Sequence, residues 1–315
     1  MKNTVFVDGQ EGTTGLQIND YLSKRTDLEI LKIDPEKRKD PEARRILLNE
    51  ADVSFLCLPD QAAIESASLV TNSKACIIDA STAHRTHPDW AYGIPELNKN
   101  QRQLIRNSHQ ITNPGCYATG FVMALYPLVQ AGLVPRDYPV TCNAISGYSG
   151  GGKKLIEKYE NPENYDSLKS PRYYSFKLLH KHVPEMQKVA GLTDKPLFTP
   201  IVCNYYKGMG VSIPLYTRLL GKKLNASDVR EVLAEYYEGE RFVKVVPFDS
   251  EAYLENGYMN VEKRNGTNVL DIFVFGNDEH IMLMSRLDNL GKGASGAAIQ
   301  NMNLHLGLDE GLGLE

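Results

Sequence analysis

The chain has 315 residues, of which 42% are hydrophobic and 23% are charged, values typical of a globular protein that can bury a core. This length suits two domains of about 100–200 residues each. The formal net charge of −4 gives no excess of positive charge for a polyanion, so we expect no nucleic-acid partner.

The sequence also argues against a membrane or metal partner. No apolar stretch reaches the roughly 18–20 residues that a membrane helix needs, and the run around Val5–Val7 is too short for a signal peptide. The five cysteines are scattered and include no Cys-x-x-Cys pair, which is typical of neither a disulfide framework nor a zinc cluster. We therefore expect a cytoplasmic protein with reduced thiols.

The first third of the chain alternates β-branched runs with helical patterns. Strands are predicted at Thr4–Asp8, Leu28–Ile33, Val53–Leu58 and Ala75–Asp79, and helices at Leu16–Arg25, Pro41–Asn49 and Ala62–Val70. Such alternation is typical of parallel βαβ units with helices on both faces of the sheet. We expect a Rossmann-like, doubly wound domain over residues 1–115, completed by a C-terminal helix within 290–315.

The pattern changes after about Asn113. Helices are predicted at Ala118–Gln130 and Ala226–Tyr237, and strands at Val140–Ile145, Phe198–Cys203, Val211–Thr217, Val243–Pro247 and Asn268–Phe275. Ser146–Lys154 is predicted to be a glycine-rich loop and Asn161–Arg172 to be irregular. These patterns favour an α+β catalytic and oligomerisation domain over residues 116–289 with a mostly antiparallel sheet. Because such sheets often pair subunits, we expect a homo-oligomer.

A glycine-rich turn directly follows the first predicted strand and precedes a helix. Gly9, Gly12 and Gly15, with Thr13 and Thr14 between them, would let backbone amides approach a pyrophosphate. The spacing is Gly-x-x-Gly-x-x-Gly rather than Gly-x-Gly-x-x-Gly, so an ordinary βα turn is the alternative. The context of strand, turn and helix favours a dinucleotide site.

The end of the second predicted strand carries two opposing signals about the dinucleotide. Asp34 stands where an acid would bind a ribose 2′-hydroxyl, as in NAD sites. Lys37, Arg38 and Lys39 follow, and a cationic cluster there would suit the 2′-phosphate of NADP, although a solvated loop has the same composition. These residues alone leave the choice open.

The most informative stretch is Asn113–Thr119, which reads Asn-Pro-Gly-Cys-Tyr-Ala-Thr. Proline and glycine end the preceding segment and helical periodicity begins after Cys116, so this thiol lies at a helix N-terminus, where a thiolate is stabilised. We predict Cys116 to be a nucleophile, and the alternative is a small residue in a turn. The other cysteines, Cys57, Cys76, Cys142 and Cys203, lie in β-branched runs and are predicted to be inert core residues.

Proton transfer and anion binding have their own candidates. His180 and His182, in the run His180–Glu185, could serve as an acid/base pair, whereas the other histidines, including His84, have no such setting. The stretch Ser146–Lys154 could form a nest of amides with lysines at its end. Arg85 follows the fourth strand and could bind a carboxylate or phosphate through two nitrogens.

With these motifs in place, the chain resembles the N-acetyl-gamma-glutamyl-phosphate reductase family, and within it the shorter of two sequence types. The resemblance runs nearly end to end, and Asn113–Thr119 is its most specific stretch. The matching stretches, in order, are Gly9–Gly15, Leu58–Asp60, Asp79–Arg85, Tyr92–Leu97, Asn113–Thr119, Ser146–Lys153, His180–Glu185 and Asp288–Gly293.

The resemblance implies NADPH-dependent reduction of an acyl phosphate, N-acetylglutamyl phosphate, to the semialdehyde and phosphate, through a thioester on Cys116. It implies that His182 is the acid/base, with His180 as the alternative, and that no metal takes part. The implied cofactor residues are Gly9, Gly12, Thr13, Thr14, Gly15, Lys37, Arg38, Pro59, Asn289, Lys292 and Gly293. The implied substrate residues are Arg85, Ser146, Gly147, Gly150, Lys153, His180 and Glu185.

Two details depart from the longer sequence type of that family: no histidine follows Pro200, and Lys207-Gly208 replaces Arg-Gly. Substrate-binding roles near these residues therefore stay open. The alternative functions are an aspartate-semialdehyde dehydrogenase, which shares the two-domain plan and the chemistry, and a non-catalytic dinucleotide-binding redox sensor that is oxidised at Cys116.

Overall fold

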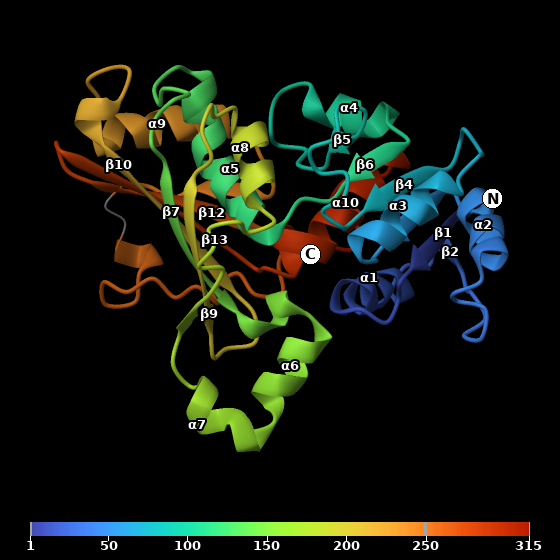
Figure 1. Ribbon diagram of the computed structural model, residues 1–315. Coiled ribbons are helices and arrows are strands. Elements are labelled where there is room, and N and C mark those ends of the chain that lie inside the picture. Colours follow the sequence, from blue (N-terminus) through green and yellow to red (C-terminus); the bar gives the residue numbers. More distant parts are fainter. Residues whose placement is uncertain (1, 249–250, 315) are drawn as a thin grey trace. The chain divides into compact units, whose positions relative to one another are not determined.

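The computed structural model describes residues 2–248 and 251–314, and it divides into two units (Figure 1). Unit 1 contains the residues up to Gly115 and those from Ala294 onward, and unit 2 is Cys116–Gly293. The C-terminal segment thus joins unit 1 at Ala294 rather than at residue 290, where the sequence patterns placed the boundary.

Unit 1 is built on a parallel sheet with the strand order β2-β1-β3-β4-β6-β5 over the described residues. The strands are β1 (Asn3–Asp8), β2 (Leu28–Leu31), β3 (Val53–Leu56), β4 (Cys76–Asp79), β5 (Ala91–Tyr92) and β6 (Gln110–Thr112). The predicted parallel sheet is confirmed. Strands β5 and β6 were not predicted, because two or three residues are too few to produce a recognisable pattern.

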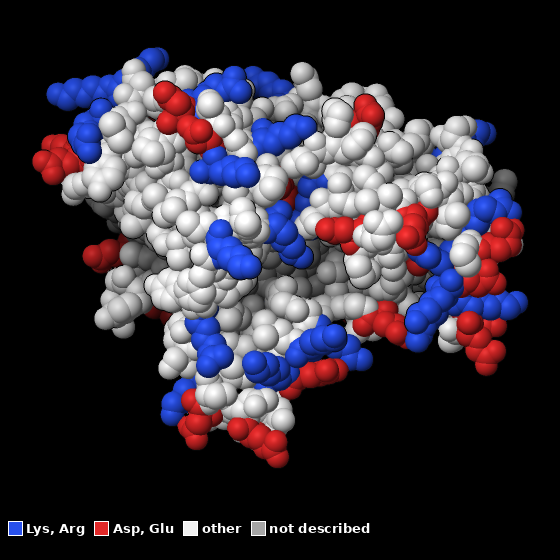
Figure 2. All heavy atoms as spheres, in the orientation of Figure 1, with Lys and Arg blue, Asp and Glu red and all other residues white. Residues whose placement is uncertain are grey.

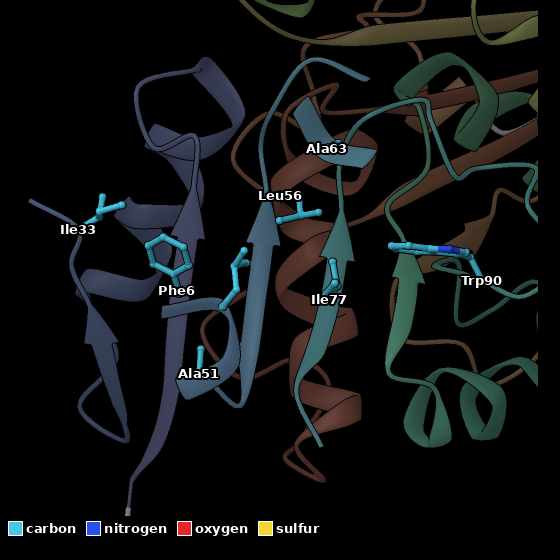
Figure 3. Close-up of a cluster of buried hydrophobic side chains, with 8 residues drawn as sticks. Phe6, Ile33, Ala51, Leu56, Ala63, Ile77 and Trp90 are labelled. Atoms are coloured by element: carbon cyan, nitrogen blue, oxygen red, sulfur yellow. The ribbon is translucent and has the colours of Figure 1, made fainter. Parts of the chain in front are cut away.

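Helices lie on both faces of this sheet. They are α1 (Thr13–Ser23), α2 (Pro41–Glu50), α3 (Asp60–Ser68), α4 (Gln101–Asn107) and α10 (Gly296–His305). A core cluster that includes Phe6, Leu56 and Ile77 lies on one face of the strands, and α10 lies behind them (Figure 3). Helices α2 and α3 contact each other near this cluster. Helix α10 contacts α1, α4 and β4, which gives the doubly wound arrangement.

Helix α1 begins three residues earlier than the sequence pattern predicted. Gly12 is its N-cap in an extended conformation, so Thr13, Thr14 and Gly15 form the first helical turn rather than the end of the glycine turn. The apolar periodicity that begins at Leu16 marks only the part of α1 that has an amphipathic pattern.

Unit 2 contains a mixed sheet with the strand order β11-β12-β13-β10-β7-β9-β8 in the described ranges. The strands are β7 (Thr141–Gly147), β8 (Arg172–Tyr173), β9 (Leu197–Cys203), β10 (Met209–Tyr216), β11 (Val243–Val245), β12 (Leu270–Gly276) and β13 (His280–Leu287). Only the pairs β11/β12 and β7/β9 are parallel, so the sheet is mostly antiparallel as predicted. Strand β13 was not predicted.

Helices α5 (Cys116–Gln130) and α9 (Ala226–Tyr236) pack on one face of the unit 2 sheet, and α8 (Val183–Ala190) packs on α5. Helices α6 (Lys153–Glu160) and α7 (Tyr165–Leu168) contact each other and lie apart from that face (Figure 1). Helix α5 contacts β10, β13, α8 and α9, and the strand residues that face it, such as Val211 and Ile213, are fully buried. Their neighbours Ser212 and Pro214 point to the other face and are half-buried.

Two segments predicted as loops carry regular structure. Ser146 and Gly147 end β7, Tyr148–Gly151 form a 3₁₀ turn, and α6 begins at Lys153. Asn161–Arg172 holds a second 3₁₀ turn, Pro162–Asn164, followed by α7. Asn161 caps this 3₁₀ turn by accepting a hydrogen bond from Glu163 N. The polar composition of the segment did not distinguish this cap from a loop. The remaining short elements are Thr217–Leu219, Glu251–Tyr253 and the π-helical turn Gly291–Ser295.

Lysine and arginine side chains are interspersed with aspartate and glutamate over the visible face of both units (Figure 2). Recognition of an anion must therefore come from individual groups rather than from a broad surface field. In the part of the chain that the structure describes, no helix is both long and apolar enough to cross a membrane.

Candidate functional site

The glycine turn of unit 1 is tightly packed at both ends. Gly9 has φ +89°, and a Cβ there would lie 2.4 Å from the carbonyl oxygen of Cys57. A Cβ on Gly15 would lie 2.5 Å from the carbonyl oxygen of Gly9. Only glycine fits these two positions, because the obstructing atoms are backbone.

The middle of this turn has the properties of an anion site. At Gly12 the nearest atom to an added Cβ is 3.8 Å away, so a ligand has room there. Gly12 provides no side-chain cap for α1, and the helix N-terminus therefore presents its first amides to a negative group. These residues fit the pyrophosphate of a dinucleotide.

The loop after β2 contains the residues that bear on the choice of dinucleotide. Arg38 forms an ion pair with Glu11 of the glycine turn, which places a guanidinium beside that turn. The Asp34 carboxylate accepts a hydrogen bond from Glu36 N at 3.0 Å and caps its own loop. Pro59 is the N-cap of α3, at the neighbouring strand end.

The sequence patterns missed an aspartate–histidine pair at the end of β4. His84 Nδ1 lies 2.6 Å from Asp79 Oδ2, and the same carboxylate accepts hydrogen bonds from the amide and hydroxyl of Ser81. The His84 ring stacks on Trp90 with centroids 4.0 Å apart. The sequence patterns gave His84 no role, and the signal that could have found it was its position after a strand end.

Arg85 supports the segment that leads to the predicted nucleophile. Its Nε donates to the carbonyl of Asn113 at 3.0 Å and its Nη2 to the carbonyl of Ala80 at 2.9 Å. Asn113 N donates to Asp79 O at 2.7 Å, and its side chain donates to Ala294 O at 2.8 Å. Arg85 therefore fixes main chain three residues before Cys116, and its predicted contact with substrate stays a prediction.

Cys116 is the first residue of α5 in unit 2 and keeps part of its surface exposed. The helix N-terminus favours an anion at this position. Gly293 lies against it: a Cβ on Gly293 would be 2.8 Å from Cys116 Cβ and 3.2 Å from Asp288 O. A side chain at 293 would displace the thiol.

The other cysteines are poor nucleophiles. Burial, with smaller contributions from the nearby Asp79 and Asp8, raises the pKa of Cys57 to about 12. Burial also raises the pKa values of Cys76, Cys142 and Cys203. Cys57 lies just beyond β3 and keeps part of its surface exposed, and its raised pKa agrees with the prediction that its thiol is inert.

Both predicted histidines surround Tyr117, the residue after the cysteine. The ring centroids of His180 and His182 lie 5.7 and 5.8 Å from that of Tyr117, in edge-on contacts. Burial raises the pKa of Tyr117 well above its usual value, and the nearby Tyr174 and Cys116 add to this effect. The structure therefore brings Cys116, His180 and His182 into one cluster at the start of α5.

Glu185 and Lys153 take different positions in unit 2. Glu185 lies in the first turn of α8 and is fully buried. Lys153 is exposed at the start of α6. Their predicted substrate contacts stay predictions.

Part of the predicted amide nest at Ser146–Lys154 is engaged within the protein. The amides of Gly147, Tyr148 and Ser149 donate to carbonyls of Gly208, Tyr205 and Tyr206. The predicted anion contacts of Ser146, Gly147 and Gly150 stay predictions. The side chain of Ser146 is buried, whereas Gly150 is exposed.

Asn289 and Lys292 lie beneath the surface of unit 2. Asn289 accepts a hydrogen bond from Gly208 N at 2.8 Å and donates to Ser149 Oγ at 3.0 Å. The Lys292 ammonium lies 5.6 Å from the centroid of the Phe242 ring, and both Asn289 and Lys292 are 1% exposed. Their predicted cofactor contacts stay predictions, and in this structure Asn289 joins the strand end at Gly208 to the turn at Ser149.

Over the described residues no group of three or more histidine, cysteine or acidic side chains is arranged to hold a metal ion. The chemistry that the residues present can perform is nucleophilic attack by a thiolate at a helix start, with two imidazoles packed around the next residue.

Two family descriptions match the chain. Residues 3–105 match the family described as "Semialdehyde dehydrogenase, NAD binding domain", and residues 116–289 match "Semialdehyde dehydrogenase, dimerisation domain". The second range coincides closely with unit 2.

Curated relatives and solved structures extend this match. An N-acetyl-gamma-glutamyl-phosphate reductase 2 from Nostoc sp. is 48% identical and covers 99% of both chains; one from Pseudomonas putida is 46% identical and covers 96% of both. The fold resembles that of aspartate semialdehyde dehydrogenase from Francisella tularensis, with a TM-score of 0.72 and 14% sequence identity. The match covers 96% of this chain and 99% of that one. The Vibrio cholerae enzyme II gives TM-score 0.70 at 15% identity, covering 97% and 98%.

Proposed function

Because the chain belongs to the N-acetyl-gamma-glutamyl-phosphate reductase family, we propose that it reduces N-acetyl-L-glutamyl 5-phosphate to N-acetyl-L-glutamate 5-semialdehyde and phosphate, a step of arginine biosynthesis. The observation that carries this proposal is the position of Cys116 at the first residue of α5, with two histidine rings packed around the next residue.

The first half of the reaction takes place on Cys116, in unit 2. The Cys116 thiolate, stabilised by the N-terminus of α5, attacks the acyl carbon and forms a C–S bond. The C–O bond to phosphate breaks and inorganic phosphate leaves, which gives a thioester. The Cys116 N–H is a candidate donor to the oxyanion that forms during this attack.

The second half needs a hydride and a proton. When bound, the reduced nicotinamide dinucleotide supplies the hydride that reduces the thioester carbonyl. His182 donates a proton to the resulting oxyanion, giving a thiohemiacetal on Cys116. His182 then removes the hydroxyl proton, the C–S bond breaks, and the semialdehyde leaves as the Cys116 thiolate is restored.

We propose NADP as the dinucleotide, held at its pyrophosphate by Gly9, Gly12, Thr13, Thr14 and Gly15. Lys37 and Arg38 would bind the 2′-phosphate, and two observations support this. Arg38 already lies beside the glycine turn through Glu11, and the Asp34 carboxylate is engaged with Glu36 N. Pro59 and Gly293 are proposed to approach the cofactor through their main chain.

Removing both basic side chains should change the cofactor preference. In the double variant Lys37→Ala/Arg38→Ala we expect KM for NADPH to rise about tenfold or more, because charge-assisted hydrogen bonds to the 2′-phosphate are lost. KM for NADH should stay within about twofold of its original value. Steady-state kinetics with both cofactors measures this, with Lys74→Ala as the control. Equal changes for NADH and NADPH would contradict the assignment.

We also propose that the chain forms a homo-oligomer through the face of the unit 2 sheet that carries no helix. The family description of residues 116–289 as a dimerisation domain supports this. Ile145, Ile201, Pro214 and Met284 alternate with fully buried residues and remain half-buried, an apolar surface suited to a second sheet.

A charge on that face should separate the subunits. Met284→Glu is expected to shift the chain from oligomer to monomer in sedimentation velocity at micromolar concentration, because an unpaired carboxylate is costly to bury. Leu104→Glu, at an exposed apolar position on α4, is the matched control and should leave the oligomer intact. An oligomer that survives Met284→Glu unchanged would rule out this face.

The activity is tested in the reverse direction, as phosphate-dependent reduction of NADP⁺ by N-acetylglutamate semialdehyde. Aspartate semialdehyde and NAD⁺ serve as controls. Turnover of aspartate semialdehyde alone would favour the aspartate-semialdehyde dehydrogenase alternative, whose solved structures share the fold. Tight NADPH binding without any turnover would favour the redox sensor. We propose a cytoplasmic location, in keeping with five free cysteines.

A further inference from the structure

We propose that Tyr174 and His180 are positioning residues that hold His182 for proton transfer, and that His180 does not itself exchange a proton with the substrate. The contacts that carry this inference form a chain of hydrogen bonds through unit 2, from the backbone of His182 to Tyr117. The inference rests on the proposed function in one respect: it takes His182 to be the residue that transfers the proton.

The proton on His180 has a defined position. His182 N donates to His180 Nδ1 at 3.1 Å, so Nδ1 presents its lone pair and the ring proton must be on Nε2. Tyr174 Oη lies 3.5 Å from that Nε2 and 3.2 Å from Tyr117 Oη. The hydrogen bonds therefore connect His182, His180, Tyr174 and Tyr117 in that order.

Both hydroxyls keep their protons over the working pH range. Burial raises the pKa of Tyr174 to about 12 and that of Tyr117 well above its usual value. A second proton on His180 would occupy Nδ1 and break the bond from His182 N. The neutral ring is thus the form that fits its neighbours, and an imidazole that must stay neutral is a poor proton shuttle.

The ring of His180 is held by packing as well. Its centroid lies 4.8 Å from that of His182 at an interplanar angle of 86°, and 5.1 Å from that of Phe198. His182 is the N-cap residue of α8, so the hydrogen bond from its amide to His180 fixes the position of the His182 side chain at the start of that helix. Movement of His180 would move His182.

The segment between the two residues has few apolar contacts of its own. Phe176 is 80% and Leu179 is 74% exposed, so these apolar side chains pack little against the described chain. Ser175 and Leu178 have φ of +61° and +56°, a conformation that is unfavourable for side chains other than glycine. The contacts of Tyr174 and His180 at its two ends help to hold the segment in this conformation.

Removing one hydroxyl tests the chain of bonds. Tyr174→Phe should lower kcat about 3- to 10-fold with KM within about twofold, the effect of losing an ordinary hydrogen bond. Tyr173→Phe is the matched control: Tyr173 is the last residue of β8, directly before Tyr174, and is 56% exposed, so the variant should keep its original kcat. Equal activity of the two variants would overturn the role of Tyr174.

Two substitutions of His180 separate positioning from proton transfer. An asparagine oxygen can stand near the position of Nδ1 and accept from His182 N, whereas a glutamine amide reaches toward the position of Nε2. His180→Asn should therefore retain about a tenth of kcat or more, and His180→Gln should lose about 100-fold. If both variants lose as much activity as Cys116→Ser, His180 takes part in the chemistry and the proposal is wrong.

A measurement without substrate keeps this inference separate from the proposed function. Long-range ¹H–¹⁵N spectra of the ¹⁵N-histidine-labelled full chain should show His180 as the Nε2–H tautomer at neutral pH, with His180→Asn used for assignment. An Nδ1–H tautomer would overturn the proposal even in a fully active enzyme. The expected tautomer in a chain that turns over no semialdehyde would support the positioning contacts and refute the proposed activity.

Discussion

Cys116→Ser is expected to lower kcat by about 10⁴-fold or more while leaving NADPH binding unchanged. A serine hydroxyl is a far weaker nucleophile than a thiolate and would form a stable ester rather than a thioester. The substitution removes no core contact, because the residue starts α5 and is partly exposed, so the free energy of unfolding should change by less than about 0.5 kcal/mol. Semialdehyde oxidation and NADPH fluorescence titration measure the two effects.

Alkylation supplies the control for this prediction. Iodoacetamide at neutral pH should label Cys116 first, because burial raises the pKa values of Cys57, Cys76, Cys142 and Cys203. Loss of activity should follow labelling of Cys116 in peptide maps, and NADPH binding should persist. Normal turnover by Cys116→Ser, or inactivation that follows labelling of another cysteine, would contradict a thioester on Cys116.

The architecture was predictable because long elements repeat a simple pattern. The β-branched runs and helical periods up to Asp79 predicted β1 to β4 and α1 to α3 of unit 1, with each helix start within three residues. Strands β5 and β6 and helix α4, which follow Asp79, were not predicted. Strand β13 was missed because His280, Met282 and Met284 lie on the helix-free face and do not look like strand residues in isolation. Their partners Tyr216, Pro214 and Ser212 on β10 define the strand through pairing, which only the folded sheet shows.

The site was predictable where chemistry depends on local position, as with Cys116 at a helix start. It was not predictable where residues distant in sequence share a role. Gly293 is needed because its Cα lies against Cys116, and Asn289 joins Gly208 to Ser149. Likewise, the sequence did not show that carbonyls of Tyr205, Tyr206 and Gly208 accept hydrogen bonds from three amides of the predicted nest. Long-range pairing of this kind leaves no periodic pattern in a single sequence.

Gly9→Ala is expected to cost about 2–4 kcal/mol in the free energy of unfolding and to abolish NADPH binding. Alanine must adopt φ +89°, and its Cβ would lie 2.4 Å from the carbonyl oxygen of Cys57 and 2.9 Å from Leu58 Cδ2. The oxygen belongs to the backbone, so the end of β3 must move away from the turn at the N-terminus of α1. Urea unfolding and fluorescence titration with NADPH measure the two losses.

Gly307→Ala separates the cost of backbone conformation from the cost of the steric clash. Gly307 also belongs to unit 1 and has φ +70°, but an added Cβ there meets no atom within 4 Å. Its replacement should cost only about 1 kcal/mol and should leave NADPH binding intact. The difference between the two variants then measures how closely the glycine turn packs on Cys57. If Gly9→Ala lowers the free energy of unfolding no more than Gly307→Ala does, the glycine turn packs less closely on Cys57 than the structure shows. Gly9 would then not be required for cofactor binding.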